Sequence, residues 1–309
     1  MADKSTKVVY AALIGNVLVA VAKFVAAFLS GSSAMLTEAI HSSTDTINQI
    51  LLLVGNKRSR ARADSSHSFG YGMEVYFWTF VVAVIVLLAG GVASIYEGVR
   101  ELAAPGPIRA PLVSFGVLVL SAVFEGSSLA VGYREYKRRV RGRVRSDRPG
   151  GMWRFIKASK DPNLYETLLE DSAALIGLGI AGVGVLASVY LHALWADGVA
   201  SIAIGILLVS NSFVIAEATR SLIAGESASV PVLKDIRRAL QTGGLRFEAS
   251  AVKTLHLGPK TILVALTIAK DHGSLGAGAR SELDDITKRL KSVDARIAFV
   301  YFRFDQDLA

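Results

Sequence analysis

Residues 32–54 read SSAMLTEAIHSSTDTINQILLLV, an apolar stretch that nevertheless contains ionisable side chains. Glu38, His41 and Asp45 are spaced three and four residues apart, and Asn48 follows after three more. An α-helix turns by about 100° per residue, so this spacing places all four side chains in one narrow stripe. Each ionisable group inside a membrane span costs about 2.5–3.5 kcal/mol on insertion scales. The stretch therefore predicts a membrane helix whose polar stripe has a function.

The composition of the whole chain also favours a membrane protein. Apolar residues make up 52% of the 309 residues and charged residues only 19%, with a mean hydropathy of +0.44. A chain with so little polar surface is neither disordered nor wholly soluble. Six segments are apolar and long enough to cross a bilayer, which needs about 20 helical residues. We expect these spans at residues 8–30, 34–54, 75–97, 110–133, 164–190 and 197–217.

The net charge of +8 is concentrated in one expected loop, residues 134–163. Residues 134–161 hold eleven Lys and Arg against three acids, a balance equal to the excess of the whole chain. Because the excess is local and adjoins membrane spans, it predicts contact with anionic membrane lipid. It gives no reason to expect nucleic acid as a partner.

Lys and Arg occupy alternate loops, which predicts an orientation. They lie before the first span, in residues 57–62 and in residues 134–163, while the other loops hold almost none. The positive-inside rule then places both termini and the basic loops in the cytoplasm. The first residues lack the signal-peptide pattern, so the first helix is expected to stay as a span. Richness in Ala, Gly, Val and Arg suggests an integral protein of a prokaryotic inner membrane.

From about residue 221 the composition becomes that of a small soluble domain. Its pattern predicts an order of helix, strand, strand, helix and strand, with a Gly258-Pro259 turn between the first two strands. Such an αββαβ order suits a small open sheet with two helices on one face. We therefore expect a six-helix transmembrane domain at 1–220, with the basic cytoplasmic loop at 134–163, and a cytoplasmic α+β domain at 221–309.

The fifth expected span carries a second polar set near its start. Thr167 and Asp171 share one helix face, and Glu166 and Glu170 share the adjacent face. Two helices that each present an i, i+4 pair toward one another can build a four-coordinate metal site. The chain has no cysteine, and imidazole with carboxylate suits Zn²⁺ first, with Mn²⁺, Fe²⁺ or Co²⁺ as competitors. The alternative is that the stripe forms a structural ion pair with Lys23 and needs no metal.

These motifs resemble one known family. The chain resembles the cation diffusion facilitators, a family of metal/proton antiporters, in four places. They are SSAMLTEAIHSSTD at 32–45, HSFGYG at 67–72, Asp171 early in the fifth span and DGVAS at 197–201. The αββαβ tail resembles that family's ferredoxin-like, metallochaperone-like domain. ETLLED at 166–171 together with LGPK at 257–260 is most similar to the subgroup related to the ninth human zinc transporter.

The resemblance implies a transport site made of His41, Asp45 and Asp171. The family usually places His or Asp where this chain has Thr167, and a hydroxyl is a poor zinc ligand. Glu170, Thr167 itself or water could then complete the metal's shell. The identity of the fourth ligand and of the preferred metal stays open at this point.

A second family site is expected in the loop between the second and third spans. Asp64 and His67 match the first two ligands of that site, but Tyr71 stands where another His is common. Two ligands hold a metal weakly. A solvated loop without metal is the alternative interpretation.

The resemblance implies a function of exporting a divalent metal from the cytoplasm in exchange for protons. Metal binding needs neutral imidazole and ionised carboxylates, so metal and protons would compete for the same atoms. We expect a homodimer joined through the αββαβ domain, no prosthetic group and no enzyme activity, since no HExxH-type helix occurs among the five histidines. The alternative function is a non-transporting protein of the same fold that senses metal or acts as a scaffold.

Overall fold

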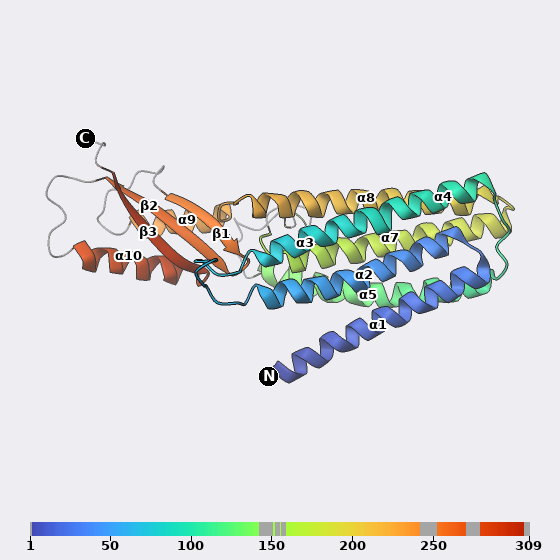
Figure 1. Ribbon diagram of the computed structural model, residues 1–309, viewed down its shortest axis with the longest axis horizontal. Helices are drawn as coiled ribbons and strands as arrows, with labels where there is room; N and C mark the ends of the chain where they lie inside the picture. Colours follow the sequence, from blue (N-terminus) through green and yellow to red (C-terminus); the bar gives the residue numbers. More distant parts are fainter. Residues whose placement is uncertain are drawn as a thin grey trace.

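The computed structural model describes residues 2–141, 151, 155, 159–241, 252–269 and 279–305. These residues form a long bundle of helices with a small three-stranded sheet and its helices at one end (Figure 1). The bundle helices are α1 (Ala2–Ser30), α2 (Ser33–Arg58), α3 (Glu74–Ile85), the π-helical stretch η1 (Val86–Val92), α4 (Ala93–Ala103), α5 (Pro111–Arg141), α7 (Pro162–Tyr190) and α8 (Trp195–Ile223).

Among the described residues, five helical stretches are long and apolar enough to cross a membrane. They are α1, α5, α7, α8 and the continuous helix of α3, η1 and α4 over Glu74–Ala103. The helix α2 falls outside this group because the polar side chains of its stripe lower its apolar character. It nevertheless packs against α1, α3, α7 and α8 and is therefore an inner helix of the same bundle.

A turn at Gly31 joins α1 to α2, and the φ angle of +70° at this residue favours glycine. The start of α2 is then fixed from two sides. The Ser32 hydroxyl accepts a hydrogen bond from the Met35 backbone N–H at 3.2 Å. The buried carboxylate of Asp197 in α8 accepts from the Ser32 hydroxyl at 2.7 Å and from the Ser33 backbone N–H at 2.5 Å. A negative charge at a helix N-terminus is stabilising, so Asp197 ties α8 to the N-terminal end of α2.

The helix α5 is longer than the sequence pattern indicates. The expected span ended at residue 133, but the helix continues through Arg141. In its last turns Glu135 pairs with Arg138 and with Arg139, each at 2.8 Å. Pairs at i, i+3 and i, i+4 support a helix, so the charge that marks the end of an apolar span does not end the helix. The first basic residues of the expected loop are therefore helical.

The small domain shows the expected αββαβ order among the described residues. Its elements are α9 (Val230–Gln241), β1 (Val252–Gly258), β2 (Thr261–Ala269), α10 (Ala279–Val293) and β3 (Ile297–Asp305). The central strand β2 runs antiparallel to β1 and parallel to β3. Ile236 of α9, Val264 of β2 and Leu290 of α10 are fully buried in one apolar core between helices and sheet.

The loop between α2 and α3 docks onto this domain. The Phe69 ring packs edge-on against Phe299 of β3 at 5.3 Å between ring centroids. Gly72 and Gly258 approach so closely that a Cβ atom on Gly258 would lie 2.8 Å from the Gly72 carbonyl oxygen. Gly258 also has a φ of +152°, which side chains disfavour. The two glycines therefore allow the domain to sit directly against the end of the bundle.

Candidate functional site

The polar stripe of α2 lies inside the bundle. Glu38, His41 and Asn48 are at most 1% exposed, and Asp45 is 7% exposed. The spacing of three and four residues places one polar side chain on the inner face of α2 in each successive turn, as the sequence predicted. Burial of so many polar groups is costly, and each one needs a partner.

Lys23 of α1 pairs with the first residue of this stripe. Its ammonium donates to the Glu38 carboxylate at 2.9 Å and to the Ser42 hydroxyl at 2.7 Å, and both charged side chains are fully buried. Lys23 thus forms an ion pair, as the metal-free alternative requires, but the partner is Glu38. Within the described residues it has no ion pair with His41 or Asp45.

His41 and Asp45 are left facing each other without a hydrogen bond. His41 Nδ1 lies 3.3 Å from Asp45 Oδ1, one helical turn apart. Both imidazole nitrogens and this carboxylate oxygen are buried and have no hydrogen-bond partner among the described residues. An unsatisfied buried polar atom costs about 1–3 kcal/mol, so these atoms fit a bound cation or water better than an empty apolar contact.

The helix α7 brings a second group of acids to the same region. Its Glu170 accepts a hydrogen bond from the Asn48 side-chain amide of α2 at 2.7 Å. The carboxyl groups of Glu170 and Asp45 are also adjacent across the helix boundary. Glu166 is 1% exposed, and neither of its carboxylate oxygens has a hydrogen-bond partner in the described part of the chain. We call the six residues of the two helices the polar cluster: His41, Asp45, Asn48, Glu166, Glu170 and Asp171.

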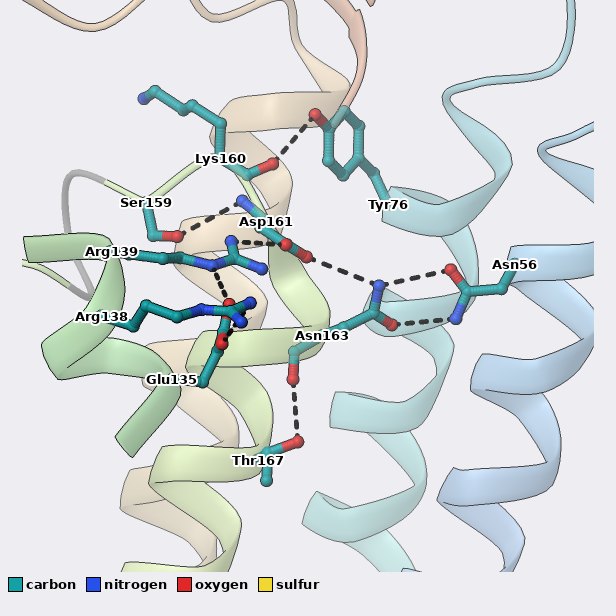
Figure 2. Close-up of polar contacts among 10 residues, drawn as sticks. All are labelled: Asn56, Tyr76, Glu135, Arg138, Arg139, Ser159, Lys160, Asp161, Asn163 and Thr167. Atoms are coloured by element: carbon teal, nitrogen blue, oxygen red, sulfur yellow. Dashed lines mark hydrogen bonds and ion pairs between the residues drawn. The ribbon is translucent and has the colours of Figure 1, made fainter. Parts of the chain in front are cut away.

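Two of the expected ligands behave differently from the rest. The Thr167 hydroxyl donates to the Asn163 backbone carbonyl of its own helix at 2.8 Å, as Figure 2 shows. Asp171 contacts the Ser128 hydroxyl of α5, while its Oδ2 atom is buried without a partner. Over the described ranges no three His, Asp or Glu side chains gather closely enough to hold one metal ion. The structure therefore brings Asp45 to His41 and to Glu170 but does not bring Asp171 to His41.

One acid near the cluster is absent from the candidates derived from sequence. Glu125 of α5 exerts an electrostatic effect on both Asp45 and Asp171, so a third helix contributes charge to the region. A lone acid in an apolar helix fits an interhelical hydrogen bond or a surface location equally well, and for this reason the sequence pattern does not single it out. Its depth within an expected span marks Glu125 as an intramembrane acid, but this signal does not decide between a structural role and proton transfer.

The loop candidates Asp64 and His67 are close together but already engaged. Asp64 Oδ1 accepts from the backbone N–H groups of Ser66 and His67 at 2.9 and 2.7 Å, and its Oδ2 accepts from the Tyr71 hydroxyl at 2.7 Å. The Tyr71 hydrogen bond, followed by the His67 N–H, lowers the pKa of the exposed Asp64 carboxyl. These contacts close a turn, which is what the solvated-loop alternative expects.

The polar residues at the sheet-bearing end of the bundle pair with one another (Figure 2). Asp161 occupies the position before the first residue of α7, but its carboxylate caps no N–H group and instead accepts from Arg139 of α5 at 2.8 Å. Asn56 of α2 and Asn163 of α7 exchange two amide hydrogen bonds at 3.0 and 3.2 Å. We call these residues, with Glu135, the end network. It clamps α2, α5 and α7 together.

Comparison with known proteins agrees with this arrangement. Residues 9–223 match the family model described as the cation efflux transmembrane domain. The chain is 35% identical over 219 residues to the human proton-coupled zinc antiporter SLC30A9, mitochondrial, a stretch covering 70% of this chain and 38% of that protein. It is 28% identical over 257 residues to metal tolerance protein C4 of Arabidopsis thaliana, covering 82% of this chain and 55% of the plant protein.

A bacterial relative is similar over nearly its whole length. The transporter YdbO of Bacillus subtilis is 27% identical over 281 residues, which cover 88% of this chain and 87% of that protein. In contrast, the chain spans less than two fifths of the human relative and little more than half of the plant relative. The family match includes α2 and α7, which carry the polar cluster. The resemblance drawn from the motifs is thereby confirmed. The chain is an integral membrane protein of the cation diffusion facilitator, or cation efflux, family and is close to the SLC30A9 subgroup, and the relatives named here are transporters and not enzymes.

Proposed function

We propose that this chain is a secondary transporter that exports a divalent metal cation, Zn²⁺ first, from the cytoplasm in exchange for protons. The observation that carries the proposal is the polar cluster, in which His41, Asp45, Glu166 and Asp171 each keep at least one buried nitrogen or oxygen atom without a hydrogen-bond partner in the described residues. Such atoms in a family of cation efflux domains are best explained as ligands of the transported ion. The name of the human relative supports zinc and protons as the two substrates.

In this proposal His41 and Asp45 of α2 are the permanent half of the site. His41 Nδ1 and Asp45 Oδ1 lie 3.3 Å apart, so one cation could contact both side chains. Glu170 is the α7 ligand already adjacent to Asp45, and Asp171 joins the site when α7 turns against α2. Thr167 is the weakest candidate, because a neutral hydroxyl is a poor zinc ligand; its proton is donated to the Asn163 carbonyl at 2.8 Å. Imidazole with two carboxylates favours Zn²⁺, while Mn²⁺, Fe²⁺ and Co²⁺ would compete.

The same atoms would carry the protons. A metal ion binds only to neutral imidazole and to ionised carboxylates, so each binding event releases protons from the cluster. When the site faces the cytoplasm the metal displaces protons. When it faces the opposite side, protons that enter the carboxylates and the imidazole expel the metal. Competition for one set of atoms is then sufficient to couple the two fluxes.

We also propose the topology that this mechanism needs. The helix α2 crosses the membrane with the five apolar stretches, which gives six spans in a domain over residues 1–220, followed by a ferredoxin-like domain over 221–309. The distribution of Lys and Arg supports cytoplasmic termini. The near full-length match to a Bacillus protein supports a prokaryotic plasma membrane, and a homodimer would be joined through the small domains.

The experiment uses the purified chain in liposomes that contain a pH-sensitive dye. Addition of Zn²⁺ to one side should move zinc inward and protons outward together. His41→Ala and Asp45→Ala should abolish both fluxes, and His192→Ala, which removes an exposed histidine between α7 and α8, should leave them unchanged. Zinc flux without proton counterflow would contradict the coupling, and full flux in the Asp45→Ala protein would contradict the site.

A second candidate function is a non-transporting member that senses metal or serves as a scaffold. It is favoured by the engaged hydroxyl of Thr167 and by the absence, in the described ranges, of three gathered ligands. In that case the liposomes would show zinc binding without zinc flux. Binding measured by calorimetry on the same preparation separates the two functions.

A further inference from the structure

A cavity of about 700 Å³ lies where the end of the bundle meets the small domain. Its walls come from α2, the loop before α3, the segment before α7 and the turn between β1 and β2. This volume falls in the range of known small-molecule sites, which is about 300–1,000 Å³. The cavity is separate from the polar cluster, because none of the six cluster residues lines it.

The wall of this cavity is strongly basic. Five cationic side chains line it against a single acid, Asp161, and they are Arg60, Arg139, Lys160, Lys260 and Arg296. Lys160 is 9% exposed, so one of these charges is held in an almost fully buried position. A concentration of like charge around a concave surface is costly unless an anion neutralises it.

Three of the five cations have acidic partners within the protein. Lys160 pairs with Glu226, and Arg296 makes a two-pronged contact with Asp294 at 3.0 and 2.6 Å. Arg139 is held by members of the end network, as Figure 2 shows. In the part of the chain that the structure describes, Arg60 and Lys260 have no ion-pair partner. Both side chains are exposed, so the cavity keeps two cationic side chains that an anionic ligand can reach.

The positive potential of this region reaches a neighbouring histidine. Burial first lowers the pKa of His256, and the positive charges of Arg296 and Lys160 lower it further. The imidazole makes a 3.3 Å contact with the Gly258 carbonyl, in the same turn that lines the cavity.

We propose that this cavity binds a phosphate group, carried either by a soluble phosphate ester or by the headgroup of an anionic phospholipid. A phosphate monoester has a charge of about −1.5 to −2 at neutral pH, which matches the two cations without partners. Arg offers a planar fork and Lys a point charge, and both are common phosphate ligands. Arg60 belongs to the bundle side and Lys260 to the small domain, so a phosphate between them would bridge the two parts of the chain.

The test is calorimetry on the purified full-length protein in neutral detergent without added metal. The two probes are sodium glycerol 3-phosphate and dihexanoyl phosphatidic acid, both of which carry a phosphate monoester. Saturable binding of the soluble ester would identify a soluble ligand, and binding of the lipid alone would identify a headgroup site. Both results support the proposal. Absence of saturable binding with both probes, or the same heat from sodium chloride of equal ionic strength, would overturn it.

A matched pair of variants assigns the site. The double variant R60Q/K260Q removes the two cations without partners and should weaken binding by about tenfold for each lost charge. The control K253Q/R303Q removes two exposed cations from β1 and β3, outside the cavity, and should bind as the native chain does. Equal loss in both double variants would overturn the site.

Thermal unfolding of both double variants checks that they are folded. His41→Ala should keep full phosphate binding whatever becomes of metal transport. Failure of this proposal is thereby distinguishable from failure of the proposed transport function.

Discussion

The polar cluster and the end network are built from the same kinds of residue on the same helices, but their hydrogen bonding differs. In the end network Asp161, Arg139, Asn56 and Asn163 pair with one another at 2.8–3.2 Å. In the polar cluster His41, Asp45, Glu166 and Asp171 keep buried atoms without partners among the described residues. Paired polar groups hold helices together. Under the proposed function, the unpaired atoms are the ones that the transported cation would use.

The largest expected effect concerns the buried ion pair of Lys23 and Glu38 beside the cluster. Lys23→Ala leaves the Glu38 carboxylate buried without a partner and should lower the free energy of unfolding by about 3–5 kcal/mol. The double variant Lys23→Met with Glu38→Gln removes both charges and should recover most of this loss. Thermal unfolding in detergent measures both. Equal stability of the single variant and the native chain would mean that the pair has no structural role.

A pair of Asp→Asn variants should give opposite results in the two regions. Asp161→Asn loses the charge on a partly exposed pair with Arg139 and should cost about 0.5–1 kcal/mol of stability, with metal affinity unchanged. Asp45→Asn removes a carboxylate that has no hydrogen bond to its Oδ1 atom, so it should keep or raise stability while zinc binding is lost. Calorimetric zinc titration and thermal unfolding of both proteins test the contrast. A large stability loss in Asp45→Asn would show that this carboxylate is structural.

The smallest expected effect concerns the loop turn around Asp64. The pKa of the Asp64 carboxyl lies below its ordinary range because the charged carboxylate accepts hydrogen bonds from the Tyr71 hydroxyl and the His67 backbone N–H. A lowered pKa means that the turn is stabilised above the ordinary pKa of about 4 and loses this contribution as the pH falls through the lowered value. Tyr71→Phe should shift the loss to higher pH. Hydrogen exchange of the loop amides against pH measures the shift, and an unchanged midpoint would count against the hydrogen bond.

Several features of the fold could be predicted from particular residues. The spacing of Glu38, His41, Asp45 and Asn48 is enough to predict a buried stripe, because polar groups repeat with the helical period in an otherwise apolar segment. The αββαβ order of the tail also follows from its alternating apolar pattern. The end of α5 could not be predicted in this way, since the pattern marks where the apolar span stops and not where the helix stops.

Only part of the candidate site could be predicted from the sequence. The motif residues His41 and Asp45 lie four positions apart on one helix, so their proximity is a local property of the chain. Three other features depend on rotamers or on how neighbouring helices pack. They are the closeness of Asp45 to Glu170, the hydrogen bond from Thr167 to Asn163 and the charge that Glu125 adds nearby. No periodicity within one segment contains that information.

The order and spacing of side chains along the chain were therefore sufficient for the membrane class, the polar stripe, the small αββαβ domain and the family. These features arise within single helices and strands, whose geometry follows from short-range spacing. Other features depend on how the helices pack against each other and against the sheet. They are the partner of Lys23, the pairing of the end network and the basic cavity between Arg60 and Lys260. Each joins residues that are far apart in sequence, and contacts of that kind are fixed by how whole elements dock.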